Sequence, residues 1–315
     1  MSTIQSLTGE ISIEDLGYTL IHEHLRTRDE RVVAQFPHLY DVEEEVALAV
    51  EQVKAAKERG VQTIFDPTVM GLDRDVRFMK RIADETGMQI IAATGIYTFH
   101  YLPTRFVAND IDFMAKQFVR DIEVGVQNTS IRAGFLKCAT DIQGITPDVE
   151  KVIRAVARAH HQTGVPIMTH SHPASETGLK QIAIFKEEGV PLNNVLIGHC
   201  GDSDNLDYIE RVIDSGAFIG MDRYGITRVL STEKRNQTVI ELVIRGYANR
   251  MFLSQDYCCT TDFHKPEAAK RAHYPDWSMT FLMDKVIPTL KENGVSAKHI
   301  QTMMVENVKS WISIN

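Results

Sequence analysis

The stretch TPDVEKVIRAVARAHHQTGVPIMTH, residues 146–170, indicates the fold class of this chain. Thr146-Pro147 is typical of a helix cap and first helical position, and apolar residues then recur at helical spacing. Gly164 follows where a left-handed helix end is needed. The apolar run Val165–Thr169 comes next and ends in His170. A helix that leads through a glycine into a short strand is the repeating unit of an α/β fold.

This unit recurs along the chain. Short apolar runs predict eight strands at Tyr18–Ile21, Val61–Phe65, Gln89–Ala93, Ile131–Leu136, Val165–Thr169, Val195–Gly198, Phe218–Met221 and Met251–Ser254. Helical periodicity follows them at Val42–Glu58, Asp75–Thr86, Ile111–Val126, Pro147–Thr163, Glu176–Glu188, Asn205–Ser215, Thr232–Tyr247 and Trp277–Glu292. Eight such units predict an α/β chain with parallel strands closed into one (β/α)8 TIM barrel. The alternative is an open doubly wound sheet, which favours a G-x-G-x-x-G turn that this sequence lacks.

Length and composition support one large globular domain over residues 1–315. The 315 residues are 43% hydrophobic and 24% charged, so a large core can form and disorder is not expected. The net charge of −8 argues against nucleic acid and anionic membranes as partners. Neither a signal peptide nor an apolar run of roughly 20 residues is visible. Four cysteines without a C-x-x-C motif suit a reducing cytoplasm.

Polar side chains stand where the predicted strands end. Along the chain they are His22 and His24, Asp66, Tyr97, Lys137, His170, His199, Asp222 with Arg223, and Asp256. In such barrels the carboxyl ends of the strands carry the chemistry, so these groups are expected at one rim. His22 and His24, two residues apart on a strand, point to the same face and can hold one metal ion. Each histidine alone is as well explained by an ordinary hydrogen bond, but the joint pattern predicts a metal site.

Lys137 is the unexpected member of this group. An ammonium beside two divalent cations is repelled, because nearby like charge disfavours the protonated form. A neutral lysine amine can instead take up carbon dioxide and become N6-carboxylysine, an anion able to bridge two metals. Without the histidines, a lysine that reaches solvent past its strand is the simpler interpretation.

The ordered series of H-x-H, Lys, His, His and Asp resembles the amidohydrolase superfamily and, within it, the phosphotriesterase family, closest to its lactonases. The motifs that carry the resemblance are Leu20-Ile21-His22-Glu23-His24-Leu25, Asp66-Pro67-Thr68, Ala93-Thr94-Gly95-Ile96-Tyr97, Gly134-Phe135-Leu136-Lys137, Thr169-His170-Ser171, Ile197-Gly198-His199, Met221-Asp222-Arg223-Tyr224-Gly225 and Ser254-Gln255-Asp256-Tyr257-Cys258-Cys259. The resemblance covers essentially the whole chain.

The resemblance implies a centre of two divalent metal ions. The expected ligands are His22, His24 and Asp256 for the more buried metal, His170 and His199 for the more exposed metal, and carbamylated Lys137 with a hydroxide between them. Nitrogen and carboxylate ligands of this kind suit zinc, cobalt, iron and manganese alike. The resemblance also implies a homodimer. Asn307-Val308 departs from the Asn-Pro usual in relatives, far from the site.

The same resemblance assigns catalytic roles to Asp256, Tyr97 and Arg223. Asp256 is expected to accept a proton from the attacking water and pass it to the leaving oxygen. The expected substrate-binding residues are Tyr97, Phe99, Leu72, Arg223, Cys258 and Phe263, and loop residues Ile226, Leu230 and Trp277 are further candidates. The long segment Tyr257–Asp276 is the expected substrate-gating loop.

The sequence therefore predicts a metal-dependent lactonase that hydrolyses N-acyl-homoserine lactones and related lactones, with weaker activity on phosphotriesters. Its partner is then a small lactone or organophosphate. The first alternative is a true phosphotriesterase or arylesterase that uses the same metals. A barrel that binds metal without catalysis is the remote alternative, and structural zinc sites, which are closed and rich in cysteine, do not resemble this one.

Overall fold

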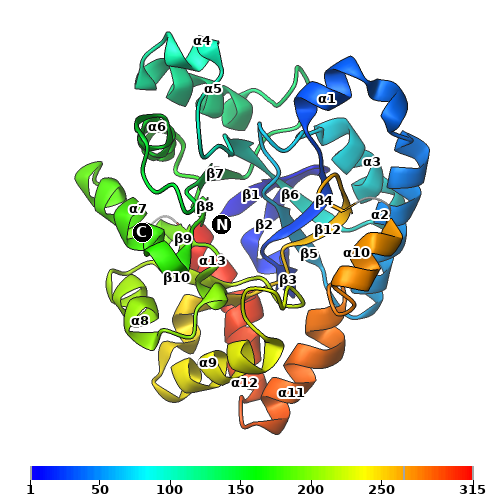
Figure 1. Ribbon diagram of the computed structural model, residues 1–315, viewed down its shortest axis with the longest axis vertical. Coiled ribbons are helices and arrows are strands. Elements are labelled where there is room, and N and C mark those ends of the chain that lie inside the picture. The colour runs from blue at the N-terminus through cyan, green and yellow to red at the C-terminus, as the bar shows by residue number, and fades with distance from the viewer. Residues whose placement is uncertain (1, 265–266, 314–315) are drawn as a thin grey trace.

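A computed structural model of the protein describes residues 2–264 and 267–313, and a parallel eight-stranded sheet lies at its centre (Figure 1). The strands are β3 (Thr19–Leu20), β5 (Thr63–Asp66), β6 (Gln89–Gly95), β7 (Phe135–Ala139), β8 (Ile167–His170), β9 (Val195–Ile197), β10 (Phe218–Met221) and β11 (Met251–Leu253). Their order in the sheet follows their order in the sequence. Each observed strand overlaps one predicted strand, and the (β/α)8 TIM barrel is confirmed.

Helices surround these strands (Figure 1). They are α1 (Glu30–Gln35), α2 (Val42–Glu58), α3 (Val76–Thr86), α4 (Thr104–Val107), α5 (Ile111–Glu123), α6 (Pro147–Thr163), α7 (Thr177–Glu187), α8 (Leu206–Asp214), α9 (Thr232–Ile244), α10 (Glu267–His273), α11 (Ile287–Glu292), α12 (Ala297–Gln301) and α13 (Asn307–Ile312). The predicted ends of α6 are confirmed, because the Thr146 side chain accepts from Val149 N and Gly164 adopts φ 73°. Within the described residues, none of the helices has the length and hydrophobicity needed to span a membrane.

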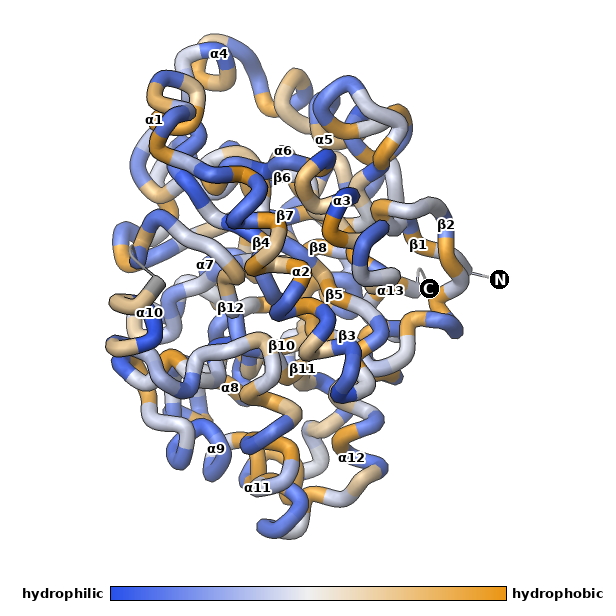
Figure 2. The backbone as a smooth tube through the Cα atoms, turned by 90° about the vertical axis from the view of Figure 1, so that its right-hand side faces the viewer, coloured by the Kyte–Doolittle hydropathy of each residue, from blue (hydrophilic) through white to orange (hydrophobic). Residues whose placement is uncertain are grey.

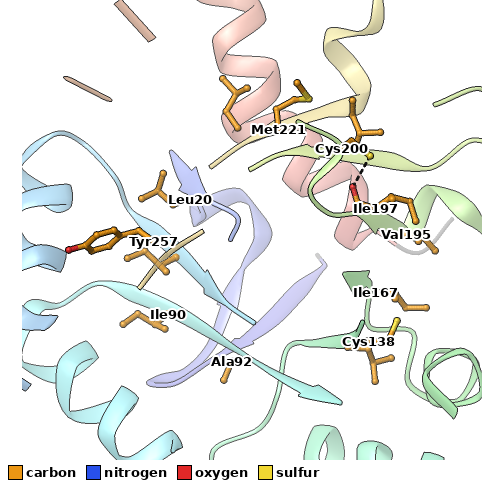
Figure 3. Close-up of a cluster of buried hydrophobic side chains, with 14 of the residues drawn as sticks. Leu20, Ile90, Ala92, Cys138, Ile167, Val195, Ile197, Cys200, Met221 and Tyr257 are labelled. Carbon is orange, nitrogen blue, oxygen red and sulfur yellow. Dashed lines mark hydrogen bonds between the residues drawn. The ribbon is translucent and has the colours of Figure 1, made fainter. Parts of the chain in front are cut away.

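The strands carry two different hydrophobic faces. On β6, Ile90 and Ala92 pack outward in the layer shared with the helices, whereas Ile91 and Ala93 belong to the cluster inside the barrel. This alternation is the two-residue period of a strand. Figure 3 shows the outward layer, in which Cys138 and Cys200 lie beside aliphatic side chains. Both cysteines therefore face away from the predicted site, as their positions one residue past a polar strand end indicate.

Outer helices have one buried and one exposed face. The tube in Figure 2 changes between hydrophilic and hydrophobic within single helices such as α2 and α3. On α2 the buried residues include Val46, Val50 and Val53, which recur at helical spacing. Burial of this stripe against the strands holds the helix layer to the barrel.

Elements outside the eight units close the amino-terminal end of the barrel. A hairpin of β1 (Thr3–Ser6) and β2 (Gly9–Ser12) lies on the same side of the molecule as α13 (Figure 2). Trp311 of α13 is fully buried against the rings of Phe65, Phe135 and Phe252, and its indole N–H donates to Ile167 O at 3.3 Å. The opposite end of the barrel is left open for a site.

The first and last units meet in a second pair of strands. β4 (Glu23–Thr27) and β12 (Tyr257–Thr261) run parallel, with Glu23 opposite Tyr257 and His24 opposite Cys258. The predicted gating segment thus begins as a paired strand and continues into α10. Its partner lies more than 200 residues away in sequence, so local periodicity gives no sign of this pairing.

Candidate metal centre

The side chains predicted to bind the more buried metal converge at the open end of the barrel. His24 Nε2 lies 3.2 Å and His22 Nε2 3.4 Å from the same oxygen, Asp256 Oδ1. Lys137 Nζ lies 3.5 Å from His22 Nε2. All four side chains are buried or nearly so, which removes them from competing water.

The two remaining predicted ligands complete the same cluster. His170 Nδ1 and His199 Nε2 lie 2.9 Å apart, and His199 Nε2 is 4.0 Å from Asp256 Oδ2. The donor atoms of His22, His199 and Asp256 all lie within 4.8 Å of one another, a spacing that a single ion can span. The structure thus brings every predicted ligand into one place.

The outward nitrogens of these rings are held by oxygen atoms. Asp222 Oδ2 lies 2.8 Å from His22 Nδ1, and Asp222 Oδ1 lies 3.1 Å from His199 Nδ1. An ionised carboxylate only accepts, so both histidines donate from Nδ1 and keep the Nε2 lone pair facing inward. Such outer partners fix the tautomer and orientation of metal-binding histidines. The sequence identified Asp222 only as a strand end and gave it no such role.

His24 and His170 have outer partners of their own. His24 Nδ1 lies 2.7 Å from Thr68 Oγ1, whose hydroxyl can donate to Arg26 O at 3.4 Å and accept from the ring. The Asp141 carboxylate lies 3.7 Å from His170 Nε2. All four imidazoles therefore aim one nitrogen at the centre and hold the other outside, which fits a bound metal.

The electrostatics of the cluster favour neutral imidazoles, the form that binds metal. Burial lowers the pKa of His22 and His199, and lowers that of His170 to about 4. Burial also lowers the pKa of Lys137 to about 8, although Asp256 attracts the charged form. Part of the Lys137 population is then a free amine near neutral pH, which is the species that takes up carbon dioxide.

The backbone around Lys137 requires a glycine on the neighbouring strand. Gly95 ends β6 with φ 144°, and a Cβ built there would lie 1.8 Å from Lys137 O. Only a residue without a side chain allows β6 to approach β7 at this point. Gly95 thus helps to fix the position of Lys137 relative to β6.

Two predicted ligands have left-handed backbone. His199 adopts φ 64° and Asp256 φ 50°. Such conformations typically cost about 1–3 kcal/mol in residues other than glycine and persist where surrounding bonds enforce them. For His199 one such bond is visible, because its amide donates to Asp222 Oδ1 at 2.8 Å.

Arg223 lies between two carboxylates. Its Nε donates to Asp256 Oδ2 and its Nη1 to Asp202 Oδ2, each at 2.9 Å. Burial would lower the pKa of Arg223, but Asp202 and Asp256 outweigh it and raise the value. Arg223 therefore stays charged and fixes the orientation of Asp256.

The cluster forms the floor of a cavity of about 380 Å³. All the residues predicted to bind substrate line it, namely Leu72, Tyr97, Phe99, Arg223, Cys258 and Phe263. Ile226 and Trp277 also line it, whereas Leu230 is buried elsewhere. Burial raises the pKa of Tyr97, so its phenol stays protonated and can donate. A larger hollow of about 570 Å³ near Asp41 and Glu43 contains none of the predicted ligands.

A buried lysine that the sequence analysis did not single out holds one wall of this cavity. Lys270 of α10 donates to Cys258 O at 2.5 Å and to Tyr257 Oη at 3.0 Å. Its ammonium also lies 4.1 Å from the centre of the Tyr257 ring. These bonds tie the helix of the predicted gating segment to β12. A charged residue in a polar helix looks solvent-exposed in sequence, so only the fold reveals this contact.

The comparisons with known proteins agree on one family. The family model described as the phosphotriesterase family matches residues 2–312. An aryldialkylphosphatase of Saccharolobus solfataricus is 50% identical over 311 residues, 98% of this chain and 99% of that protein. A phosphotriesterase homology protein of Mycobacterium tuberculosis is 42% identical over 315 residues, 98% and 96% of the two chains. The solved structure of the phosphotriesterase from Mycobacterium tuberculosis is similar with a TM-score of 0.96 and 40% identity, covering 99% and 98%.

Proposed function

The chain belongs to the phosphotriesterase family. We propose that it is a binuclear-metal lactonase with weaker activity on phosphotriesters. The observation that carries the metal-dependent part is the convergence of ring nitrogens of His22, His24 and His199 on Asp256. Lys137 lies beside His22, and His170 lies beside His199. Family membership makes the chain a hydrolase, and the lactone preference is our own assignment.

The proposed ligands divide into two sets. His22, His24 and Asp256 would hold one metal, and His170 and His199 would hold the other. Lys137, as N6-carboxylysine, would supply an anionic ligand to them. Zinc, cobalt, iron and manganese all suit these donors. When bound, two such cations polarise the substrate oxygen and lower the pKa of a shared water.

Side chains of the protein then transfer the proton and orient the substrate. Asp256 takes the proton of the attacking water and delivers it to the leaving oxygen, a step typically worth about 10²–10⁴-fold. Arg223 holds Oδ2 of that carboxylate in place through its Nε. Tyr97, which burial keeps protonated, donates a hydrogen bond to the charge that develops on the substrate.

The cavity supports a substrate with one polar head and one apolar tail. Polar groups lie at its floor, whereas Leu72, Phe99, Ile226 and Phe263 add apolar surface. A lactone would place its ring carbonyl at the metals and its one acyl tail along these apolar side chains. A phosphotriester has three ester arms and needs more apolar surface, whereas Arg223 and Asp141 add charged groups to the same cavity.

The alternative is a true phosphotriesterase or arylesterase on the same metals. It is favoured by the name of the Saccharolobus relative, aryldialkylphosphatase. Both activities use an electrophilic centre with a polarisable oxygen, so the metal cluster does not separate them. We also propose, from the family resemblance, a homodimer formed by a single-domain chain over residues 1–315, acting in the cytoplasm on a small-molecule substrate.

Relative kcat/KM decides between these substrates. Protein loaded separately with zinc, cobalt, iron and manganese is assayed on an N-acyl-homoserine lactone, a simple lactone and paraoxon. We expect at least tenfold higher kcat/KM on a lactone than on paraoxon with the best metal, and no turnover by Asp256→Ala. A paraoxon preference of orders of magnitude would replace the lactonase assignment with the alternative.

A further inference from the structure

Three consecutive backbone amides around Asp256 are held by the stretch that contains the paired histidines. Gln255 N donates to Glu23 Oε1 at 3.0 Å, Asp256 N to His22 O at 3.0 Å, and Tyr257 N to Glu23 Oε2 at 2.7 Å. Glu23 therefore holds the peptide group before Gln255 and the one after Asp256, and His22 O holds the one between them. We call residues 22–23 and 254–257, joined in this way, the carboxylate clasp.

Ser254, the first residue of the second segment of the carboxylate clasp, links Glu23 to His22. Its hydroxyl donates to Glu23 Oε1 at 2.7 Å and accepts from His22 N at 3.0 Å. Glu23 is completely buried, so each of these bonds forms away from water, where such bonds are strongest. In the described part of the chain, β3 and β11 share no strand ladder, and the first and last units pair only through β4 and β12. The bonds of Glu23 and Ser254 therefore join the first and last units where a ladder is missing.

The carboxylate clasp also explains how Asp256 keeps its unusual backbone. Asp256 lies at φ 50°, a region that an aspartate rarely adopts without enforcement. Its neighbour Gln255 is fixed as well, since the Gln255 side chain accepts from Leu282 N at 2.7 Å and donates to Met279 O at 3.0 Å. With both flanking peptides held, the backbone position of Asp256 is set, and its carboxylate lies beside His22 and His24 with Arg223 on its other oxygen.

The placement of Glu23 follows from strand alternation. His22 and His24 reach the metal cluster, so the residue between them must point the other way, into the junction between the first and last units. A carboxylate there reaches Ser254, Gln255 and Tyr257. A neutral aliphatic residue would leave the amides of Gln255 and Tyr257 buried without acceptors.

We propose that Glu23 is a positioning residue that sets the metal-binding geometry of Asp256. It does so by accepting hydrogen bonds from the amides of Gln255 and Tyr257. This inference rests on the proposed metal centre. Glu23 does not touch substrate or metal, and it acts through the backbone of the ligand. Its contribution is therefore specific to the metal that His22, His24 and Asp256 hold.

The test is metal titration of Glu23→Gln with cobalt, followed by absorption spectroscopy and by chelator competition. Glutamine keeps the shape but offers one acceptor and places an NH2 group against amide donors. We expect about 10–100-fold weaker binding of one of the two cobalt ions, the usual effect of losing an outer partner of a ligand, with a changed cobalt spectrum. Ser254→Ala, which removes a smaller part of the carboxylate clasp, is expected to give a smaller change in the same direction and serves if Glu23→Gln does not fold.

Trp311→Phe is the matched control for general loss of stability. It lowers Tm through packing at the opposite end of the barrel, and we expect its cobalt affinity and spectrum to equal those of the wild type. Two results overturn the inference. In the first, both Ser254→Ala and Glu23→Gln bind both ions with wild-type affinity. In the second, Glu23→Gln does not fold and Ser254→Ala binds both ions with wild-type affinity. An equal loss in Trp311→Phe also overturns the inference. If the wild-type protein itself binds no metal, the proposed function fails instead, which is a distinguishable result.

Discussion

Asp222 joins His22 to His199, because its two carboxylate oxygens accept from Nδ1 of both rings, at 2.8 Å and 3.1 Å. These histidines belong to different proposed metals. One buried carboxylate thus orients a ligand of each metal, and a change at Asp222 is expected to disturb both metals together. Glu23 differs in this respect, since its hydrogen bonds lie around ligands of only one of the two proposed metals.

Asp222→Asn is expected to weaken the binding of both metals by about 10–100-fold. An asparagine oxygen can accept from only one of the two rings, and its NH2 group faces the N–H of the other. That ring then has to move its proton to the nitrogen that faces the metal. Competition with a chelator measures the change. Asp121→Asn, which removes a carboxylate bonded to Arg74 and Thr94 outside the cluster, is the control. Unchanged affinity in Asp222→Asn would show that the bridge does not orient the ligands.

Lys137→Ala is expected to lose metal and activity together, because no anion remains between the two cations. A short carboxylic acid supplied in bicarbonate-free buffer should partly restore both, since its carboxylate takes the place of the carbamate. Metal analysis and lactone turnover, each with and without the acid, check this. Full activity in the untreated variant would rule out the bridging role of Lys137.

Tyr97→Phe is expected to lower lactone kcat by about tenfold while the metal content stays at the wild-type value. The change removes one hydrogen bond to the developing charge, and ~1.4 kcal/mol of barrier corresponds to a factor of ten. The exposed Tyr101→Phe serves as the control and should behave as wild type. Loss of metal from Tyr97→Phe would mean instead that the phenol supports the cluster.

The pKa of His170 predicts a pH dependence for the metal-free protein. Burial lowers this pKa from 6.5 to about 4, so the unfolded chain binds the proton at a higher pH than the folded chain. The contribution of His170 to the free energy of unfolding is fully present above pH 6.5. It is lost as the pH falls toward 4, and its size is on the order of 3 kcal/mol.

The measurement compares wild type with His170→Gln, both stripped of metal, by denaturant unfolding between pH 7 and 4. The comparison isolates His170, because burial also lowers the pKa of His22 and His199, and their contributions to stability are lost in the same direction. We expect the wild type to lose stability more steeply than the variant as the pH falls, and parallel curves would contradict the assignment.

Local patterns predicted the barrel, and they predicted that the polar residues at the strand ends share one rim. Strand ends and helix caps depend on neighbouring residues, so the segment from Thr146 to His170 can be interpreted alone. Each predicted ligand was also a residue at the end of a strand, and the barrel brings strand ends together. His22, Lys137 and Asp256 meet for that reason, although 234 positions separate the first from the last.

The bonds that orient those ligands were not predictable in the same way. Asp222 accepts from His22 across 200 positions, and Glu23 accepts from Tyr257 across 234. No local period encodes such pairs. Strand alternation puts Glu23 on the face opposite the two histidines, but its partners depend on how the barrel closes. Lys270 was missed because a lysine in a polar helix usually faces solvent.

Gly95→Ala tests whether close strand approach sets the position of Lys137. The added Cβ would lie 1.8 Å from Lys137 O, so β6 or β7 has to move, and we expect about 3 kcal/mol of destabilisation and a loss of bound metal. Gly9→Ala is a matched control, because Gly9 has a similar φ of 128° with no atom within 4 Å of the added Cβ. Both variants carry the backbone strain of a side chain at positive φ, and only Gly95→Ala adds the clash. Denaturant unfolding and metal analysis of the pair therefore separate the two effects. Equal destabilisation of the two variants, with full metal content in Gly95→Ala, would show that the approach of β6 to β7 does not determine where Lys137 enters the cluster.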